Sequence, residues 1–535
     1  MKVVSVEQMR ELERRMAERG VPEPELMERA GLGFAREVER CVGPVKGQSV
    51  LALIGPGNNG GDGLVASRHL QAAGASVTAY LWHRRADDQR VKEARLAGVK
   101  IVNADEDHGF ATLRAEAEKA SVAIDALFGI GRLRPFGNDL RAALDIVRRS
   151  RHPAAVVRGQ TFLTGLQRLA EEPVVFAVDV PSGVDADSGE ADESTLAADV
   201  TVTFGFPKVG LFAFPARALT GGISVVDIGM PEALADDIHL DLLTGSSVAE
   251  MLPRRPLDAN KGTFGRALIF AGSLHYIGAA YLAAAAAGRV GAGLVTLSSP
   301  RSLLPILASK LTETTYEPLD ESEPGVAGDV SPYFVRGLVQ RYHCLLLGCG
   351  LGQLAPTASF VLATLRVLQE TGTVPLVLDA DGLNVVSKRT DWPNLLPPRT
   401  VLTPHPGEMA RLTGLPIDQV LRDRLAAARN AAQEWRSVVV LKGAHTIVAE
   451  PDGSASLSPF ANPALATAGT GDVLAGAIVG LLAQGLKLEN AAKCGVYLHG
   501  LAGELASAAM GDTGVIAGDL LPRLPLAIRQ LRLNE

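Results

Sequence analysis

Residues 466–476 read Ala-Thr-Ala-Gly-Thr-Gly-Asp-Val-Leu-Ala-Gly, and an apolar, alanine-rich segment follows directly. Gly469 and Gly471 permit a tight turn, because glycine tolerates positive φ. The apolar segment predicts a buried helix that begins at Asp472. Backbone N–H groups at a helix start lack intrahelical partners and lie at the positive end of the helix dipole. The stretch therefore predicts a phosphate pocket in which Asp472 acts as a general base.

The same stretch also fits an ordinary glycine-rich loop with an aspartate N-cap. Short motifs of this kind match by chance. The choice between the two interpretations therefore depends on the rest of the chain.

Composition describes an ordinary globular protein of 535 residues, 47% hydrophobic and 21% charged, which predicts two or three domains. A formal charge of −7 without a long basic run argues against nucleic-acid binding. The N-terminus turns amphipathic and charged at once, unlike a signal peptide. The most apolar run, residues 473–483, is shorter than a membrane span. We expect a cytoplasmic protein that contacts no membrane.

The cysteines are too scattered for a disulfide scaffold or a zinc site. Cys344 and Cys349 lie in or beside an apolar strand, which favours buried structural thiols.

The first half alternates strands and helices. An unbroken apolar strand, residues 49–54, runs into Gly-Pro-Gly-Asn-Asn-Gly-Gly-Asp-Gly at 55–63 and then a predicted helix, 64–73. Strand, glycine loop and helix present backbone N–H groups to a diphosphate. The loop lacks both the dinucleotide fingerprint and the P-loop lysine.

Two later strands of this half carry a carboxylate near the carboxyl end, Asp125 and Asp179. Ligands bind at that edge of an open parallel sheet. Asp179 is therefore a candidate general acid or base beside Ser182, although a lone strand-end aspartate can also simply cap a loop.

Four motifs of this half, GPGNNGGDG (55–63), IDALFGIGRLRPFG (124–137), VDVPSGVDADSGE (178–190) and FGFPKVGLF (204–212), resemble the epimerase domain of the NAD(P)H-hydrate repair family, the YjeF N-terminal type. The resemblance covers residues 1 to about 230 and implies a Rossmann-like three-layer α/β/α domain, which we place at 1–235.

The family's substrate-binding positions match Asn58, Asn59, Gly60, Gly61, Asp62, Gly129, Ile130, Gly131, Arg132, Leu133, Arg134, Pro135 and Asp179. The resemblance also implies that Asp179 shuttles the proton in epimerisation. It further implies that a potassium ion is held by Asn59, Asp125 and Ser182. Residues 148–172 are longer than the family's usual connection, and such insertions are commonly surface loops.

The second half repeats the alternation, and polar groups again follow the strands. His405 stands between two prolines in a rigid turn, which favours a site role. Lys442 follows an apolar strand and precedes a glycine, where it can meet a phosphate. His69, by contrast, lies within a predicted helix and is expected to be structural.

Six segments, FGRALIFAGS (264–273), GCGLG (348–352), LDADGLN (378–384), LTPHPGEMARL (402–412), VVVLKGAHTIV (438–448) and ATAGTGDVLAG (466–476), resemble the dehydratase domain of the same family. The resemblance implies a ribokinase-like α/β fold, which we place at 236–535. The family's substrate positions match Ala279 (or Ala280), Gly352 (or Gly350), His405 and Asp472, and its nucleotide positions match Lys442, Gly443, Ala444, His445, Thr446 and Gly471.

Together the two resemblances imply a bifunctional enzyme acting on NADHX and NADPHX, the hydrated forms of NADH and NADPH. The first half equilibrates the R and S epimers, and the second dehydrates the S form with ADP or ATP. Asp472 takes the proton of the ring hydroxyl, and Mg²⁺ bridges the nucleotide phosphates. Base rates favour a homo-oligomer.

Two alternatives stay open at this stage. The second half also fits a small-molecule kinase, because such kinases share the Gly-Thr-Gly-Asp element. The first half also fits a nucleotide-binding module without catalysis, although Asp179 and Ser182 are both present.

Overall fold

The chain divides into two compact units, Met1–Ile238 and His239–Glu535. The structure is a computed structural model that describes residues 1–131, 135–153, 171–329 and 331–533. The assignment of one activity to residues 1–235 and another to 236–535 stays a prediction. Among the described residues, no helix has the length and apolarity that crossing a bilayer requires.

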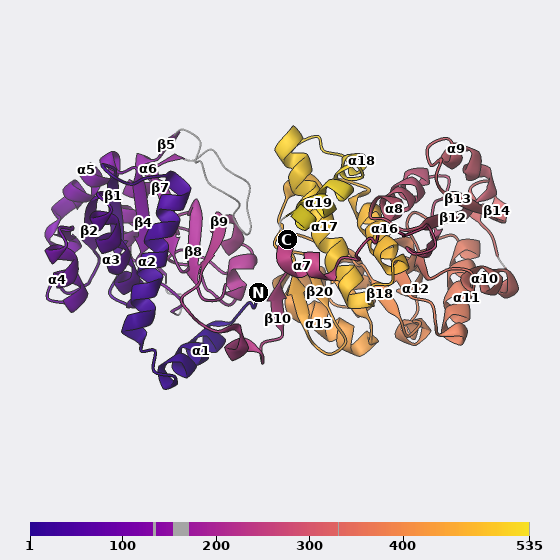
Figure 1. The fold of residues 1–535 in the computed structure, drawn as a ribbon, viewed down its shortest axis with the longest axis horizontal. Helices are drawn as coiled ribbons and strands as arrows, with labels where there is room; N and C mark the ends of the chain where they lie inside the picture. The colour runs from indigo at the N-terminus through magenta and orange to yellow at the C-terminus, as the bar shows by residue number, and fades with distance from the viewer. Residues whose placement is uncertain (132–134, 154–170, 330, 534–535) are drawn as a thin grey trace. The chain divides into compact units, whose positions relative to one another are not determined.

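The first unit is built on a seven-stranded parallel sheet in the order β3-β2-β1-β4-β7-β8-β9 (Figure 1). Its strands are β1 (Ser49–Ile54), β2 (Ser76–Leu81), β3 (Lys100–Asn103), β4 (Val122–Ala126), β7 (Val174–Val178), β8 (Val200–Phe204) and β9 (Gly222–Val226). Its helices are α1 (Val6–Glu18), α2 (Glu23–Val42), α3 (Asn58–Ala72), α4 (Gln89–Leu96), α5 (Ala111–Lys119) and α6 (Asn138–Ser150).

Strand side chains alternate between two separate cores, which makes this unit three-layered as predicted. Val50, Ala52 and Ile54 of β1 face the core formed with α2 and α3. Leu51 and Leu53 face the core formed with α5 and α6. The short strands β5 (His152–Pro153) and β6 (Glu171–Glu172) pair with each other. Most of the predicted surface insertion, residues 154–170, lies outside the described residues.

Helix α3 begins at Asn58, six residues earlier than the predicted start at Leu64. The glycine-rich segment therefore forms the first helical turns, not a loop. The reason is close packing: a Cβ at Gly60 would lie 2.1 Å from the Gly55 carbonyl oxygen, and one at Gly63 would lie 2.4 Å from the Ala126 side chain. Only glycine lets the helix start this close to the sheet, and this contact outweighs glycine's low helix propensity.

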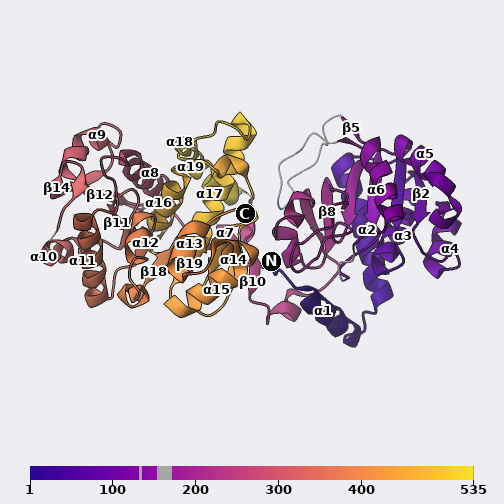
Figure 2. The same ribbon diagram turned by 180° about the vertical axis from the view of Figure 1, so that it is seen from behind.

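The second unit holds a ten-stranded sheet in the order β10-β21-β20-β19-β18-β17-β16-β11-β12-β13 (Figure 2), parallel except where β20 pairs with its two neighbours. Its strands are β10 (Leu240–Leu242), β11 (Arg266–Phe270), β12 (Leu294–Pro300), β13 (Thr315–Leu319), β16 (Cys344–Leu347), β17 (Leu376–Leu378), β18 (Thr400–Leu402), β19 (Val438–Leu441), β20 (Ile447–Ala449) and β21 (Ala455–Leu457), with β14 (Glu321–Glu323) and β15 (Val326–Ala327) paired apart.

Helices cover both faces of this sheet, and Figures 1 and 2 show them from opposite sides. They are α7 (Gly245–Met251), α8 (Ile277–Arg289), α9 (Leu304–Ala308), α10 (Pro332–Val339), α11 (Ala355–Thr371), α12 (Asp381–Val386), α13 (Pro406–Thr413), α14 (Ile417–Arg422), α15 (Arg424–Trp435), α16 (Thr470–Ala483), α17 (Leu488–Met510), α18 (Ala517–Leu520) and α19 (Arg523–Leu533).

The predicted buried helix of residues 473–482 is confirmed as α16, which begins at Thr470 instead of Asp472. Gly469 is its N-cap, with φ +91°, and the Thr470 hydroxyl donates to the carbonyls of Leu465 and Thr467. These two bonds fix the turn one residue before Gly471. Asp472 consequently lies inside the first turn, where the dipole favours a negative charge.

Both sheets change strand order at a point where ligands bind in open α/β sheets. In the first unit the change lies between β1 and β4, and in the second it lies between β11 and β16. Each of these four strands is followed within three residues by a glycine: Gly55, Gly129, Gly272 and Gly348.

Helices α8 and α16 pack at glycine contacts, and this packing gives a stability prediction. A Cβ at Gly476 would lie 2.2 Å from the Ala283 carbonyl oxygen, whereas one at Gly337 in α10 would meet open space. We expect Gly476→Ala to lower the free energy of unfolding by about 1–3 kcal/mol and Gly337→Ala to raise it by up to about 1 kcal/mol. Urea unfolding monitored by circular dichroism compares the two, and equal effects would contradict the packing argument.

Candidate active sites

A cavity of about 1380 Å³ opens at the carboxyl edge of the first sheet. This volume is larger than that of most small-molecule pockets. The predicted substrate residues that line it are Asn58, Asn59, Asp62, Gly129, Ile130, Gly131, Pro135 and Asp179. Gly60 and Gly61 instead pack against the protein, next to Gly55 and Met27 respectively. Arg132, Leu133 and Arg134 lie outside the described residues.

Asp179 follows β7 in a left-handed backbone conformation, with φ +66°, which is uncommon for a residue other than glycine. Its Oδ1 accepts hydrogen bonds from Lys208 Nζ (2.5 Å), Thr203 Oγ1 (2.9 Å) and the Phe204 amide (3.3 Å). Oδ2 has no hydrogen-bond partner among the described residues. The side chain therefore offers one anchored and one unpaired oxygen at the cavity wall.

Lys208 is buried, with 1% of its side chain exposed, and it also donates to Thr203 and to the Phe204 carbonyl. A buried ammonium is costly without an anionic partner. The contact with Asp179 thus neutralises both charges and fixes the carboxylate.

Asp125 and Ser182 meet directly between β4 and the turn after β7. The Ser182 amide donates to Asp125 Oδ2 (2.8 Å) and the Ser182 hydroxyl to Oδ1 (2.5 Å). Burial raises the pKa of Asp125, while these hydrogen bonds lower it. Asn59, 7% exposed, lies beside Gly129, and its Nδ2 is buried without a partner among the described residues.

Asp62 occupies the first turns of α3 and faces the same cavity. Burial, with repulsion from Asp179 and Glu13, raises the pKa of Asp62 well above its ordinary value. A carboxyl group in this environment favours its protonated form, which can donate a hydrogen bond.

The backbone before α3 is held from behind by Arg84. Its guanidinium donates to the carbonyls of Gly55 and Gly57, both at 2.9 Å, and pairs with Asp88. The carbonyls of the turn therefore point into the protein, away from the cavity.

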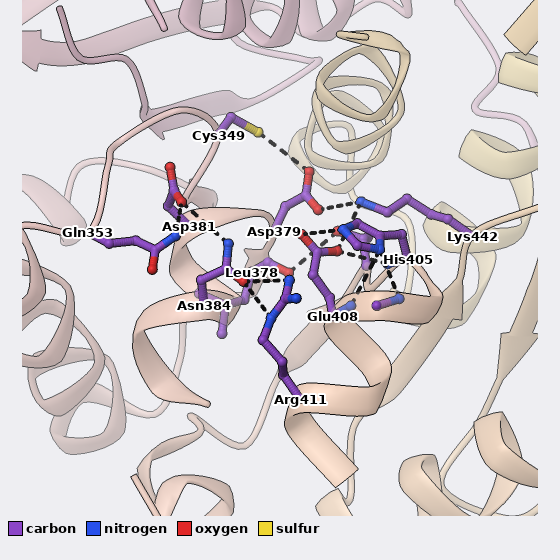
Figure 3. A network of polar contacts seen from close by, with 12 residues as sticks. Cys349, Gln353, Leu378, Asp379, Asp381, Asn384, His405, Glu408, Arg411 and Lys442 are labelled. Atoms are coloured by element: carbon purple, nitrogen blue, oxygen red, sulfur yellow. Dashed lines mark hydrogen bonds and ion pairs between the residues drawn. The ribbon is translucent and has the colours of Figure 1, made fainter. Parts of the chain in front are cut away.

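In the second unit, Figure 3 shows a polar network at the carboxyl edge of the sheet. Lys442 Nζ lies 2.8 Å from Asp379 Oδ1 and 3.6 Å from Glu408 Oε2. Burial lowers the pKa of Lys442, but the carboxylates outweigh it, and the net shift is upward. Lys442 is therefore a fixed cation at the strand end.

The donor atoms of Cys349, Asp379 and Asp472 lie within 4.8 Å of one another. Cys349 Sγ is 3.6 Å from Asp379 Oδ2, and burial raises the pKa of the thiol well above its usual value. Cys344 and Cys349 are both buried, as predicted. Cys349 nevertheless borders the site, where its protonated thiol is a donor to the carboxylates.

Asp472 lies in the first turn of α16. Burial, followed by repulsion from Asp379, raises its pKa to about 6. This value suits a general base near neutral pH. Lys442 reaches the same turn, because a Cβ on Gly471 would lie 3.5 Å from Lys442 Nζ.

His405 is the N-cap of α13. Its Nδ1 accepts from the amides of Gly407 (3.0 Å) and Glu408 (3.3 Å), and Glu408 Oε2 accepts from the His405 amide (2.8 Å). This reciprocal capping box fixes the ring and leaves the proton of neutral imidazole on Nε2. Desolvation lowers the pKa of His405, and Nε2 of the half-exposed ring lies 3.5 Å from Glu408 Oε1. His69, as predicted, is structural: it pairs with Glu28 at 2.8 Å.

The remaining predicted positions border the strand ends of this network. A Cβ on Gly350 would touch the side chain of Ala279, and the Gly352 amide donates to Asp381 Oδ2 (2.8 Å). His445 is 1% exposed, and its amide donates to the Phe460 carbonyl (2.9 Å). Its ring faces the Ser458 carbonyl, so His445 supports the loop with its side chain turned inward.

Comparison with known proteins identifies both halves. Residues 267–525 match the family model described as NAD(P)H-hydrate dehydratase, and residues 23–210 match that of the YjeF-related protein N-terminus. A bifunctional NAD(P)H-hydrate repair enzyme Nnr of Thermofilum pendens is 37% identical, over 99% of this chain and 97% of the relative. The chain belongs to this family. A relative of the same name from Moorella thermoacetica is 40% identical over equal shares.

A crystal structure of an ADP/ATP-dependent NAD(P)H-hydrate dehydratase from Bacillus subtilis, co-crystallised with ATP/Mg²⁺, is 33% identical. The match covers 54% of this chain and 98% of that one, with a TM-score of 0.47. The predicted combination of a Rossmann-like first domain and a ribokinase-like second domain is confirmed.

Several residues of both sites were not singled out from the sequence. Lys208 lies within the motif at 204–212, where a lysine in an otherwise apolar segment indicates a buried cation. Asp379 and Glu408 follow strands, a position at which the sequence already indicated ligand-binding residues. Arg84 lies in a short stretch of charged residues, which gives no sign that one of them is buried.

The pair of Asp179 and Lys208 gives a testable expectation. Lys208→Met should lower the free energy of unfolding of the first unit by on the order of 3 kcal/mol, because it leaves a largely buried carboxylate unpaired. The double variant D179N/K208M, which removes both charges, should lose less free energy of unfolding than Lys208→Met. Urea unfolding of the full chain measures both, and a double variant less stable than Lys208→Met would refute the pairing.

Proposed function

We propose that the first unit interconverts the R and S forms of NADHX and NADPHX, and that the second dehydrates the S form with ADP or ATP. Membership of the family supports the assignment as a repair enzyme. The observation that carries the proposal is that each unit holds one carboxylate suited to proton transfer at the edge of its sheet, Asp179 in the first and Asp472 in the second.

In the first unit, Asp179 moves the proton through its unpaired Oδ2. Lys208 and Thr203 hold Oδ1, so the carboxylate cannot rotate away. The substrate diphosphate lies at the start of α3, where amide groups and the positive helix end favour an anion. Inversion at the carbon that bears the added hydroxyl then needs only a fixed substrate and one acid/base group.

The residues around Asp125 fit a potassium ion. Asp125, Ser182 and Asn59 offer carboxylate, hydroxyl and amide oxygens, the donor type that hard cations prefer. Asp125 is 1% exposed, and no lysine or arginine in the described chain hydrogen-bonds to it. A buried carboxylate without a cationic partner is a natural cation ligand. The unpaired Asn59 amide nitrogen is consistent with an amide whose oxygen turns toward an ion.

In the second unit, Asp472 removes the proton of the ring hydroxyl as that oxygen attacks the terminal phosphorus of ADP or ATP. The bond from this phosphorus to the bridging oxygen breaks, which releases AMP or ADP. The start of α16 and Lys442 stabilise the charge that develops on the transferred group. The bond from the ring carbon to the phosphorylated oxygen then breaks, and its electron pair leaves with the phosphate. A neighbouring ring carbon loses a proton to solvent, which restores the ring double bond. His405 is placed to donate its Nε2–H to the substrate. Mg²⁺ supplies charge neutralisation at the nucleotide phosphates.

We also propose that the enzyme acts in the cytoplasm and forms homo-oligomers. An acidic chain without a spanning helix among its described residues supports the first statement. The prevalence of symmetric oligomers among soluble enzymes supports the second.

A mixture of the two epimers of NADHX tests both activities in one assay. With ADP or ATP, Mg²⁺ and K⁺, we expect complete recovery of reduced-nicotinamide absorbance with the wild-type protein. Asp179→Ala should convert only the S form at the fast rate, and the rest should follow at the rate of spontaneous epimerisation. With Asp472→Asn, no reduced-nicotinamide absorbance should be recovered.

Two outcomes of that assay would contradict the proposal. Unchanged fast recovery of the R form in Asp179→Ala would remove Asp179 from epimerisation. A stable phosphorylated product without recovered absorbance would make the second unit a kinase.

The pKa of Asp472 predicts a pH profile. Because a general base works only when deprotonated, kcat/KM of dehydration should be level above pH 7 and fall tenfold per pH unit well below the pKa of about 6. Asp379→Asn should shift this acidic fall in kcat/KM, the acidic limb of the profile, to lower pH, because the charge of Asp379 raises the pKa of Asp472. Asp381→Asn should move it less. A limb that both substitutions leave unmoved would belong to the nucleotide instead.

A further inference from the structure

The loop after β19, residues 442–446, is held from behind by one guanidinium. Arg424, at the start of α15, donates to the carbonyls of Ala444 (2.5 Å), Leu441 (3.3 Å) and Lys442 (3.3 Å). Thus the carbonyls of three residues in or next to the loop turn toward one partly buried cation.

The amides of the same loop are oriented differently. The Lys442 amide donates to the Pro404 carbonyl and the His445 amide to the Phe460 carbonyl, both at 2.9 Å. Between them, the amides of Gly443 and Ala444 have no hydrogen-bond partner in the described chain. Two adjacent N–H groups without a partner, next in sequence to Lys442, are donors of the kind that bind phosphate.

We propose that Arg424 is a positioning residue for the nucleotide: it presets the 442–446 loop so that its free amides face the phosphates, and it adds a positive charge behind them. This inference rests on the proposed nucleotide role of that loop.

Geometry explains why this position requires arginine. Gly443 has φ +141°, and a Cβ there would lie 2.9 Å from a terminal nitrogen of Arg424, so the guanidinium packs closely against the glycine backbone. Only a planar fork with several donors reaches three carbonyls at once. A lysine at this position keeps the charge, but its single nitrogen cannot occupy the places of both terminal nitrogens, one of which donates to Ala444 and the other to Leu441 and Lys442.

Charge gives a second reason. Arg424 hydrogen-bonds to no carboxylate in the described chain, and burial lowers its pKa to about 10. Its Nε is also buried without a partner there. Most cations that are largely removed from water are neutralised by a neighbouring anion, so the partly buried Arg424 next to unpaired amides favours an anionic ligand at the loop.

Helix α15 supplies a matched control. Arg429 lies five residues further along and donates to the His239 carbonyl (2.6 Å). Burial lowers its pKa as well, and its Nε is likewise buried and unpaired. Arg429 therefore has the same side chain as Arg424 and a similar loss of hydration, but it holds a segment outside the 442–446 loop.

The test compares Arg424→Met, Arg424→Lys and Arg429→Met in the full chain. Calorimetry gives the Kd for ADP with Mg²⁺, and steady-state assays give KM for ATP and for S-NADHX. We expect Arg424→Met to raise the nucleotide Kd and KM at least tenfold while KM for S-NADHX changes less than twofold. The nucleotide Kd and KM of Arg424→Lys should fall between those of Arg424→Met and wild type. Arg429→Met should leave both values within twofold of wild type.

Thermal unfolding of each variant separates positioning from stability. A similar loss of melting temperature in the two methionine variants, with nucleotide affinity lost only in Arg424→Met, supports the inference. Equal nucleotide affinity in both variants would overturn it. A wild-type protein that binds no ADP with Mg²⁺ would overturn the nucleotide role of the loop itself, and this inference with it.

Discussion

A peptide segment cannot aim its N–H groups at a ligand unless something else satisfies the carbonyls that turn the other way, and both sites depend on this constraint. In the first unit Arg84 donates hydrogen bonds to the carbonyls of the turn before α3. In the second, Arg424 does so for the loop after β19. The Thr470 hydroxyl serves the turn before α16 in the same way. Unpaired buried carbonyls would cost more than these side chains lose in entropy.

Charge balance is the second shared feature of the two sites. Asp179 and Lys208 neutralise each other and leave one carboxylate oxygen for proton transfer. Asp379 pairs with Lys442, and burial, followed by the charge of Asp379, raises the pKa of Asp472 to about 6. The two units differ in where the cation lies: Lys208 pairs with Asp179 itself, whereas Lys442 pairs with Asp379, a neighbour of Asp472.

The sequence predicted the features that follow from local pattern. Apolar runs gave the parallel strands, and Asp125 and Asp179 were expected at the carboxyl edge because they end such runs. The start of α3 was predicted wrongly, because glycine propensity argues against a helix while the close approach to β1 and β4 favours one, and only the folded structure shows that approach. Arg424 could not be found from the sequence, since its partners are backbone carbonyls 17 to 20 residues away.

The two halves arrive at similar chemistry through unrelated motifs, which fits a chain that must handle one substrate twice. Both sites need an anion-binding helix start, because the substrate is a dinucleotide in each. They differ in the second reactant. The first turns its acid/base group toward the substrate alone, whereas the second places Lys442 and the start of α16 beside Asp472. Lys208 hydrogen-bonds to Asp179 itself, whereas Lys442 pairs with Asp379 and reaches the turn at Gly471, an arrangement that would suit a phosphoryl group in transfer.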